Sequence, residues 1–309
     1  MRQVLARVVA SLSVVLGAVT LLFLILNWLP GDPATLIAGS EANEEMIGRV
    51  RAQLGLGRPI AEQYWEYLAG LLRGDLGTSY VTREPVLERI LSQFPATLSL
   101  ALSATGLAVL VGVGLGVLSA RHHGRWLDQV IQSAALTLVS VPVFWLGILS
   151  ILVFSVWLRW LPVLDDGSIW PSVLPIACLG LFVSVPVLRL VRDGLIGTLS
   201  EPFMMTLRAK GLGERRVFFV HALRNALIPA VSLLSVLVGE LLSGTVVVET
   251  LFARQGVGRL AVEAISQKDM PMVQGAILFA STGCVLVNLL VDLAIVVIDP
   301  RTRARARSA

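Results

Sequence analysis

The chain has 309 residues, of which 55% are hydrophobic and 15% are charged, and its mean hydropathy is +0.79. This composition excludes the ordinary soluble globular classes and predicts a polytopic membrane protein. The formal net charge of +4 is informative mainly through its distribution, because basic residues of membrane proteins gather on the cytoplasmic side.

Six apolar stretches are long enough to cross a bilayer as helices. The first follows two arginines and extends for about 33 Å as a helix. It ends without a small-residue cleavage site, so we interpret it as an uncleaved span and not as a signal peptide. The predicted spans are residues 8–29, 96–120, 129–158, 171–190, 230–248 and 275–298.

The segment between the first two spans is polar and holds six basic and nine acidic residues. An excess of acidic residues favours the outer side of the membrane. Within this segment, residues 60–72 have apolar side chains at helical spacing, and Trp65 is suited to the headgroup region. The sequence therefore predicts an external extension that carries a helix lying on the membrane surface.

The charges of the other loops fix the expected orientation. Fifteen basic and five acidic residues fall on one side of the six spans, against ten basic and fourteen acidic residues on the other. The first side includes both termini, which we therefore place in the cytoplasm. The expected organisation is a first transmembrane helix (1–29), an external extension (30–95) and a transmembrane core (96–309) that contains a cytoplasmic loop at 193–229.

Small residues in the second span, Gly106, Gly112, Gly114, Gly116 and Ser119, predict that another helix approaches it closely. In the third span Pro142 removes a backbone donor and predicts a kink. A kinked helix can line a transport path.

Polar side chains inside predicted spans are costly and therefore candidates for function. Glu240 lies in the fifth span, and Asn288 and Asp292 lie four positions apart in the sixth. Each has two interpretations that the sequence leaves open, namely exposure to a water-filled path or a structural hydrogen bond between helices.

Several kinds of chemistry lack their motifs. The sequence has no G-x-x-x-x-G-K-[ST] loop, no H-E-x-x-H and no G-x-S-x-G, so neither ATP hydrolysis nor an intramembrane hydrolase centre is expected in this chain. Cys178 and Cys284 lie in apolar runs, and the adjacent His122 and His123 point to different faces of a helix. We expect no metal site.

The loop before the fifth span is patterned as helix, glycine break and helix. Ser200 or Glu201 is placed to cap a helix that has Pro202 in its first turn and Gly211 at its end. A helix of about 15 Å is too short to cross a membrane. A second helix, residues 214–227, is expected to lead through Pro229 into the bilayer.

Two helices joined at a glycine corner form a rigid projection that fits a groove on a partner. Apolar side chains at Phe203, Met204, Leu207 and Leu212 are expected to give this projection its surface. For His221 we expect a structural role in bracing the second helix. The competing interpretation is a basic loop that rests on anionic lipid.

The wording of this loop, TLRAKGL at 206–212 and HALRNALIP at 221–229, resembles the EAA loop of permeases of ATP-binding-cassette (ABC) importers, in the dipeptide, oligopeptide and nickel branch. The resemblance extends over the whole chain. It is also carried by LPGDP at 29–33, LGLGRPI at 54–60, GDLGTS at 74–79, VETLF at 248–252, QGVGR at 255–259 and DPR at 299–301.

The resemblance implies a permease subunit of the bacterial inner membrane that forms half of a pore for short peptides, with nickel or a metal chelate as the alternative cargo. It implies a second permease, two ATPase subunits that bind ATP and magnesium, and an external solute-binding protein. An ion-coupled secondary carrier is the alternative from another class. Residues implied in ATPase coupling are Thr206, Arg208, Ala209, Lys210, Gly211, Leu212, Gly213, His221, Arg224 and Asn225. Pro142, Glu240, Asn288 and Asp292 are candidates for lining the pore.

Overall fold

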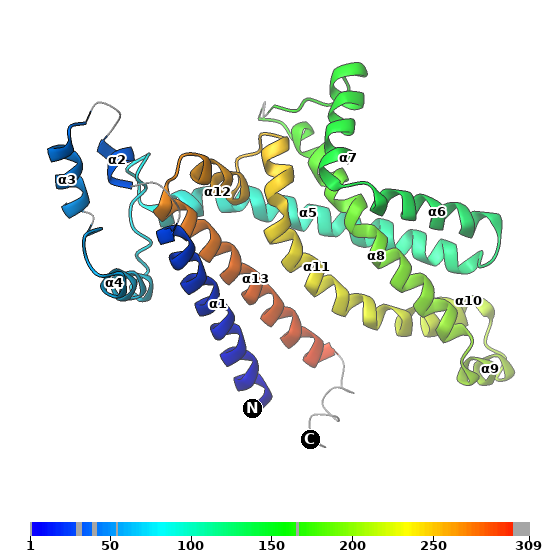
Figure 1. The fold of residues 1–309 in the computed structure, drawn as a ribbon. Helices are drawn as coiled ribbons and strands as arrows, with labels where there is room; N and C mark the ends of the chain where they lie inside the picture. The colour runs from blue at the N-terminus through cyan, green and yellow to red at the C-terminus, as the bar shows by residue number, and fades with distance from the viewer. Residues whose placement is uncertain (1, 29–32, 39–41, 54, 165–166, 299–309) are drawn as a thin grey trace. The chain divides into compact units, whose positions relative to one another are not determined.

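A computed structural model gives the fold and describes residues 2–28, 33–38, 42–53, 55–164 and 167–298 (Figure 1). The described part is helical throughout, apart from turns and one isolated antiparallel bridge between Thr78 and Pro85, so the expected all-α class is confirmed. The helices are α1 (Arg2–Trp28), α2 (Pro33–Ala38), α3 (Glu44–Gln53), α4 (Ile60–Leu72), α5 (Val86–Arg121), α6 (Trp126–Ser140), α7 (Val143–Ser150), η1 (Ile151–Trp157), η2 (Trp170–Ser172), α8 (Val173–Leu199), α9 (Pro202–Ala209), α10 (Glu214–Arg216), η3 (Val217–Ala222), α11 (Leu223–Leu251), α12 (Val257–Ser266) and α13 (Met270–Ile298).

The chain divides into two compact units. The first, which we call the extension unit, comprises Met1–Thr97 and Gln255–Val285, and the second, the core unit, comprises Leu98–Arg254 and Leu286–Ala309. The predicted boundary at residue 95 falls inside α5, which begins at Val86 and has Pro95 within it.

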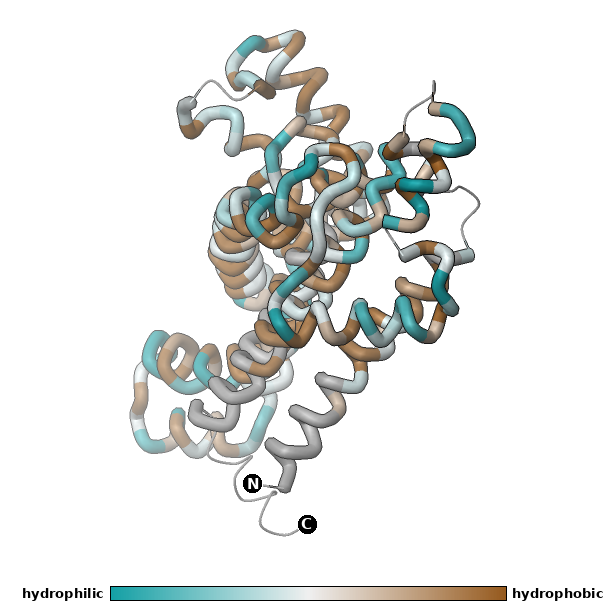
Figure 2. The backbone as a smooth tube through the Cα atoms, turned by 90° about the vertical axis from the view of Figure 1, so that its left-hand side faces the viewer, coloured by the Kyte–Doolittle hydropathy of each residue, from teal (hydrophilic) through white to brown (hydrophobic). Residues whose placement is uncertain are grey.

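Several helices meet the length and hydropathy expected of membrane spans. Among the described residues these are Val86–Arg121, Trp170–Leu199 and Met270–Val287, with the bent pair Trp126–Ser140 and Val143–Trp157 as a fourth candidate. In Figure 2 hydrophobic stretches run along the long helices, whereas hydrophilic residues gather on turns and short helices. The structure is therefore that of a polytopic membrane protein.

The predicted kink at Pro142 is confirmed. The two helices that flank Ser140–Val143 are bent by 99° relative to each other. Val141, the residue before the proline, is extended, with φ −96° and ψ 127°, because the proline ring excludes the helical conformation there. Helix α7 then restarts with hydrogen bonds from Trp145 and Leu146 to the carbonyl of Pro142.

In the core unit α5 and α8 approach closely at glycines. A Cβ atom added at Gly112 would lie 2.8 Å from the carbonyl oxygen of Ser184, and one added at Gly116 would lie 2.8 Å from that of Leu188. These two glycines confirm the predicted close approach. Gly114, on the same helix, has open space at that position.

The extension unit contains a helix, α4, over residues 60–72 as predicted. It contacts α1 through the stacked rings of Phe23 and Tyr67, whose centroids lie 5.8 Å apart, and through a 2.6 Å hydrogen bond between the hydroxyls of Thr20 and Tyr64. Burial raises the pKa of the Tyr67 phenol to about 12, with a smaller contribution from Tyr64.

A buried carboxylate fastens the extension unit internally. Asp269, which is 3% exposed, accepts a hydrogen bond from the Ser79 hydroxyl and another of 3.0 Å from the backbone N–H of Tyr80. The Ser79 hydroxyl in turn accepts a 2.9 Å bond from the N–H of Thr82. The GDLGTS motif at 74–79 is thus tied to the residue that precedes α13.

Two boundary predictions are wrong. The fifth span was predicted to end at residue 248, but α11 continues to Leu251 and includes Glu249, which is fully buried, and α12 follows. The second loop helix was expected to end at about residue 227, ahead of Pro229. Instead α10, η3 and α11 follow one another without a break, and Pro229 lies inside α11. Proline is tolerated inside a transmembrane helix because neighbouring groups and small local changes of the helix satisfy the backbone groups that lose their hydrogen bonds.

Candidate functional site

Helix α9 begins as the sequence predicts, with Glu201 as the N-cap residue in an extended conformation and Pro202 in the first turn. The capping interaction itself is different from the prediction, because no side chain caps this helix. The Ser200 hydroxyl donates instead to the carbonyl of Ile196, at the end of α8, over 2.9 Å. Ser200 therefore belongs to the end of α8.

The end of α9 is a Schellman motif, which is a helix terminus closed by a left-handed residue. Gly211 has φ +79°, and its N–H donates to the carbonyl of Arg208 over 2.9 Å. The N–H of Leu212 donates to the carbonyl of Leu207 over 3.3 Å. Gly211 is therefore the residue that turns the chain, as predicted.

An ion pair closes this corner from the outside. The Nε atom of Arg208 lies 2.7 Å from Oε1 of Glu214, the first residue of α10. The Glu214 carboxylate raises the pKa of the Arg208 guanidinium, chiefly through this hydrogen bond. Residues 207–214, which we call the glycine corner, thus have their two ends linked by backbone and by side chains.

Buried side chains anchor the glycine corner. Met204 of α9 and Val217 and Ala222 of η3 are fully buried in the core unit. The expectation that Met204 contributes to the exposed surface is therefore wrong. Met205 is 71% exposed in its place, because neighbouring residues of a helix point in different directions.

The implied coupling residues are exposed for the most part. Leu212, His221 and Asn225 are half-buried. The others are exposed, and they are Thr206, Arg208, Ala209, Lys210, Gly211, Gly213 and Arg224. The predicted brace at His221 involves its backbone, since the amide Nδ2 of Asn225 donates to the His221 carbonyl oxygen over 2.9 Å.

The candidates for lining a pore are only partly covered by the structure. Pro142 is exposed at the bend between α6 and α7. The side chains of Glu240, Asn288 and Asp292 lie outside the described part, as does the DPR motif at 299–301. A pore-lining role for these four candidates stays a prediction.

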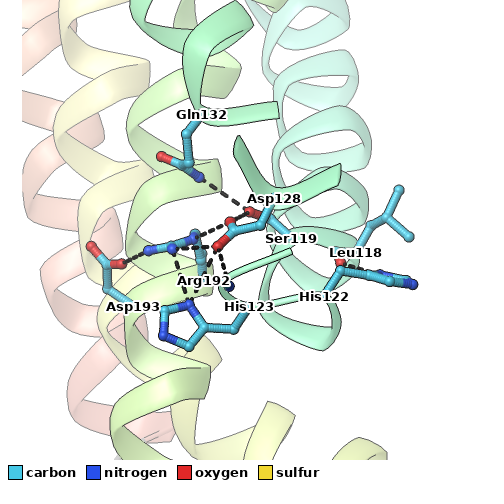
Figure 3. Close-up of polar contacts among 9 residues, drawn as sticks. Leu118, Ser119, His122, His123, Asp128, Gln132, Arg192 and Asp193 are labelled. Carbon is cyan, nitrogen blue, oxygen red and sulfur yellow. Dashed lines mark hydrogen bonds and ion pairs between the residues drawn. The ribbon is translucent and has the colours of Figure 1, made fainter. Parts of the chain in front are cut away.

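One group of residues was missed by the sequence analysis. Asp128 was counted as an ordinary cytoplasmic acid, but it is 3% exposed and accepts two hydrogen bonds of 2.8 Å from Nε and Nη2 of Arg192 (Figure 3). The Ser119 hydroxyl and the N–H of Gly124 donate to the same carboxylate over 2.5 and 3.0 Å. The only sequence signal was an acid in the first turn of a helix after a basic loop.

Comparison with known proteins gives the family. Residues 112–304 match the family described as binding-protein-dependent transport system inner membrane component, and residues 1–101 match the N-terminal region of such membrane components. The chain is similar to the glutathione transport system permease protein GsiC of Salmonella choleraesuis (strain SC-B67), with 41% identity over 98% of this chain and 99% of that protein. It is 40% identical to GsiC of Escherichia coli (strain K12), with the same coverage.

A solved structure shares the fold. The crystal structure of an amino acid ABC transporter with histidines matches 70% of this chain and 94% of its own, with a TM-score of 0.50 and 14% sequence identity. The family identifies the chain as a multi-pass protein of the inner membrane and as a transport subunit, not an enzyme. The chain therefore belongs to the family of binding-protein-dependent transport system inner membrane components, as an ABC importer permease of the peptide and nickel branch.

Proposed function

We propose that this permease forms half of a translocation pore for short peptides and crosses the membrane six times, with both termini in the cytoplasm. The spans are α1, α5, the bent pair of α6 with α7 and η1, α8, α11 and α13. The lengths of the helices support this assignment, since α1 and α11 have 27 and 29 residues and about 20 suffice to cross a bilayer. The excess of basic residues on the predicted cytoplasmic side supports the orientation.

The glycine corner is the part that docks on an ATPase subunit. The observation that carries this proposal is that Met204 and Val217, which flank the corner, are buried while Ala209, Lys210 and Gly211 within it are exposed. Helix α9 has eight residues and is about 12 Å long, which is too short for a span. A short, rigid helix that is anchored from one side suits insertion into a groove of a partner.

The other subunits follow from this assignment. A second permease completes the pore, two ATPases bind ATP and magnesium, and an external binding protein delivers the cargo. Closure of the ATPases moves the glycine corner and, through it, the spans, so that the pore opens alternately to the two sides. This chain itself binds no cofactor in the proposed cycle.

A short peptide is the cargo that the relatives favour. Glutathione, which gives GsiC its name, is a tripeptide, and the similarity to GsiC covers nearly all of both chains. Nickel or a metal chelate is the second candidate, because the motifs of the branch are shared. The two candidate cargoes can be separated by measuring uptake of labelled glutathione or of a labelled dipeptide. The competitor is excess unlabelled tripeptide in one assay and excess nickel in the other.

Docking is tested by adding a charge to the exposed surface of the corner. Ala209→Asp should abolish co-purification of the ATPase subunits with the tagged permease and stop ATP-dependent uptake, because a docking groove excludes an unpaired carboxylate. The matched control is Ala61→Asp, which alters an exposed alanine of α4 in the extension unit and should leave co-purification unchanged. Normal co-purification and uptake with Ala209→Asp would exclude the proposal.

Transport by this chain alone in vesicles with an ion gradient would favour a secondary carrier.

A further inference from the structure

The α5–α6 corner, residues 119–128, contains a polar cluster whose carboxylate is fully satisfied. Asp128 accepts two bonds from Arg192 of α8, one from Ser119 and one from the backbone of Gly124. The lone pairs of both carboxylate oxygens therefore accept hydrogen bonds. A planar guanidinium held by both oxygens fixes orientation as well as distance.

Other groups surround this pair. Nη1 of Arg192 also donates to Asp193 over 2.8 Å, and Nδ1 of His123 lies 3.2 Å from Nη2 of Arg192 and 3.3 Å from Oδ2 of Asp128 (Figure 3). Asp193 is 67% exposed in its side chain, so its bond to Arg192 is on the solvent side. The buried half of the cluster is therefore the contact between Asp128 and Arg192.

The same corner also contacts the chain beyond the glycine corner. The guanidinium carbon of Arg121, the last residue of α5, lies 5.9 Å from the ring centroid of Phe218 and 5.8 Å from that of Phe219. Both rings belong to η3. A guanidinium within about 6 Å of an aromatic face is attracted to it.

These two contacts lie on opposite sides of the glycine corner along the chain. Helix α8, which holds Arg192, ends at Leu199 and leads into α9 at Pro202. Helix η3 begins directly after α10. One short corner thus holds both the segment that enters the glycine corner and the segment that leaves it.

Stability alone is a poor reason for a buried ion pair, since the cost of removing both charges from water offsets most of their attraction. Helices α5 and α8 are already packed through Gly112 and Gly116. The bidentate ion pair lies at the end of this α5–α8 contact. It fixes the orientation of α8 relative to the α5–α6 corner. Its contribution is geometric.

We propose that the α5–α6 corner is a clamp that keeps α8, the glycine corner and η3 in one rigid body, with Asp128 and Arg192 as its positioning residues. Its role in transport rests on the proposed function. During transport the clamp transmits the full displacement of the glycine corner to α5 and α8. Without it, the ATPase subunits stay bound, but their movement is taken up by local bending of the loop.

Hydrogen exchange on the full-length permease in detergent tests the clamp without any partner. Asp128→Asn should accelerate amide exchange about tenfold in residues 202–222, because α8, which leads into them, loses its ion pair with the α5–α6 corner. Exchange in α4 of the extension unit should not change. The matched control is Asp193→Asn, which removes the exposed partner of the same arginine and should have little effect. Unchanged exchange in Asp128→Asn, or an equal effect in Asp193→Asn, would overturn the proposal.

The assembled transporter in liposomes tests the consequence. With Asp128→Asn the ATPase subunits should co-purify as in the wild type, while the ATP hydrolysed per peptide imported should rise, because part of the movement of the glycine corner no longer reaches the spans. Arg192→Lys, which keeps the charge but not the bidentate grip, should give an intermediate ratio. A wild-type ratio in Asp128→Asn would overturn the clamp.

A further variant covers the case in which Asp128→Asn fails to fold because Arg192 loses its buried partner and keeps only the exposed Asp193. Asp128→Asn combined with Arg192→Gln removes both charges and should restore folding, with the fast exchange and the raised ATP ratio retained. Restored coupling in this double variant would contradict a positioning role. If the wild-type glycine corner binds no ATPase, the proposed function fails, and the exchange experiment still decides whether the clamp exists.

Discussion

Arg208 and Glu214 face each other across the turn at Gly211, with 2.7 Å between Nε and Oε1. The pair joins the last turn of α9 to the first residue of α10. It therefore bridges the same turn that the backbone hydrogen bonds of Gly211 and Leu212 stabilise. Exposed ion pairs contribute little to stability. The shape of the glycine corner therefore depends mainly on its backbone.

Gly211→Ala should weaken the glycine corner, because φ +79° places an alanine Cβ against its own backbone at a cost of about 1 kcal/mol or more. Amide exchange in residues 207–214 should rise, and co-purification of the ATPase subunits should fall. Gly213→Ala is the matched comparison, since Gly213 has φ −64° and open space around its Cβ position. Equal losses for the two variants would show that the left-handed turn is not the determinant.

Gly112→Ala should destabilise the core unit, because the new methyl group would lie 2.8 Å from both the Ser184 carbonyl oxygen and the Val187 Cβ atom. Separating α5 from α8 to relieve this overlap should cost about 1–3 kcal/mol. Thermal unfolding of the purified permease measures the loss. Gly114→Ala, two positions along the same helix with nothing within 4 Å, should be neutral or slightly stabilising. A lower midpoint for Gly114→Ala than for Gly112→Ala would contradict the packing shown here.

Asp269→Ala should loosen residues 75–86 in the extension unit. The change leaves the buried hydroxyl of Ser79 and the N–H of Tyr80 without their acceptor, at a cost of about 2–4 kcal/mol. Faster proteolysis within 75–86 is the expected readout. Glu263→Ala removes a half-exposed acid that is paired with Arg259, and it should cost less than about 1 kcal/mol. Resistance of Asp269→Ala to proteolysis, equal to that of Glu263→Ala, would count against the proposed fastening.

Local rules of the backbone allowed much of the fold to be predicted. The helix at 60–72, the bend at Pro142 and the turn at Gly211 all follow from properties of single residues and their neighbours, such as a missing donor, a fixed φ or a freedom to adopt positive φ. Hydropathy likewise identified the apolar helices, because a bilayer demands long runs of apolar residues. These features require no knowledge of what lies across the structure.

Tertiary structure alone decided which side chains are buried and which distant residues meet. Asp128 and Arg192 are 64 positions apart, and Ser79 and Asp269 are 190 apart, so no local pattern pairs them. The same is true of Met204, whose burial depends on how α9 packs within the core unit, and of Glu249, which lies in α11 beyond the predicted end of the fifth span. From sequence alone, an acidic residue in a polar loop is predicted to be exposed to solvent. Only the fold shows that distant residues donate hydrogen bonds to it and bury it. The glycine corner was thus determined by sequence, whereas its anchors and its clamp were determined by packing.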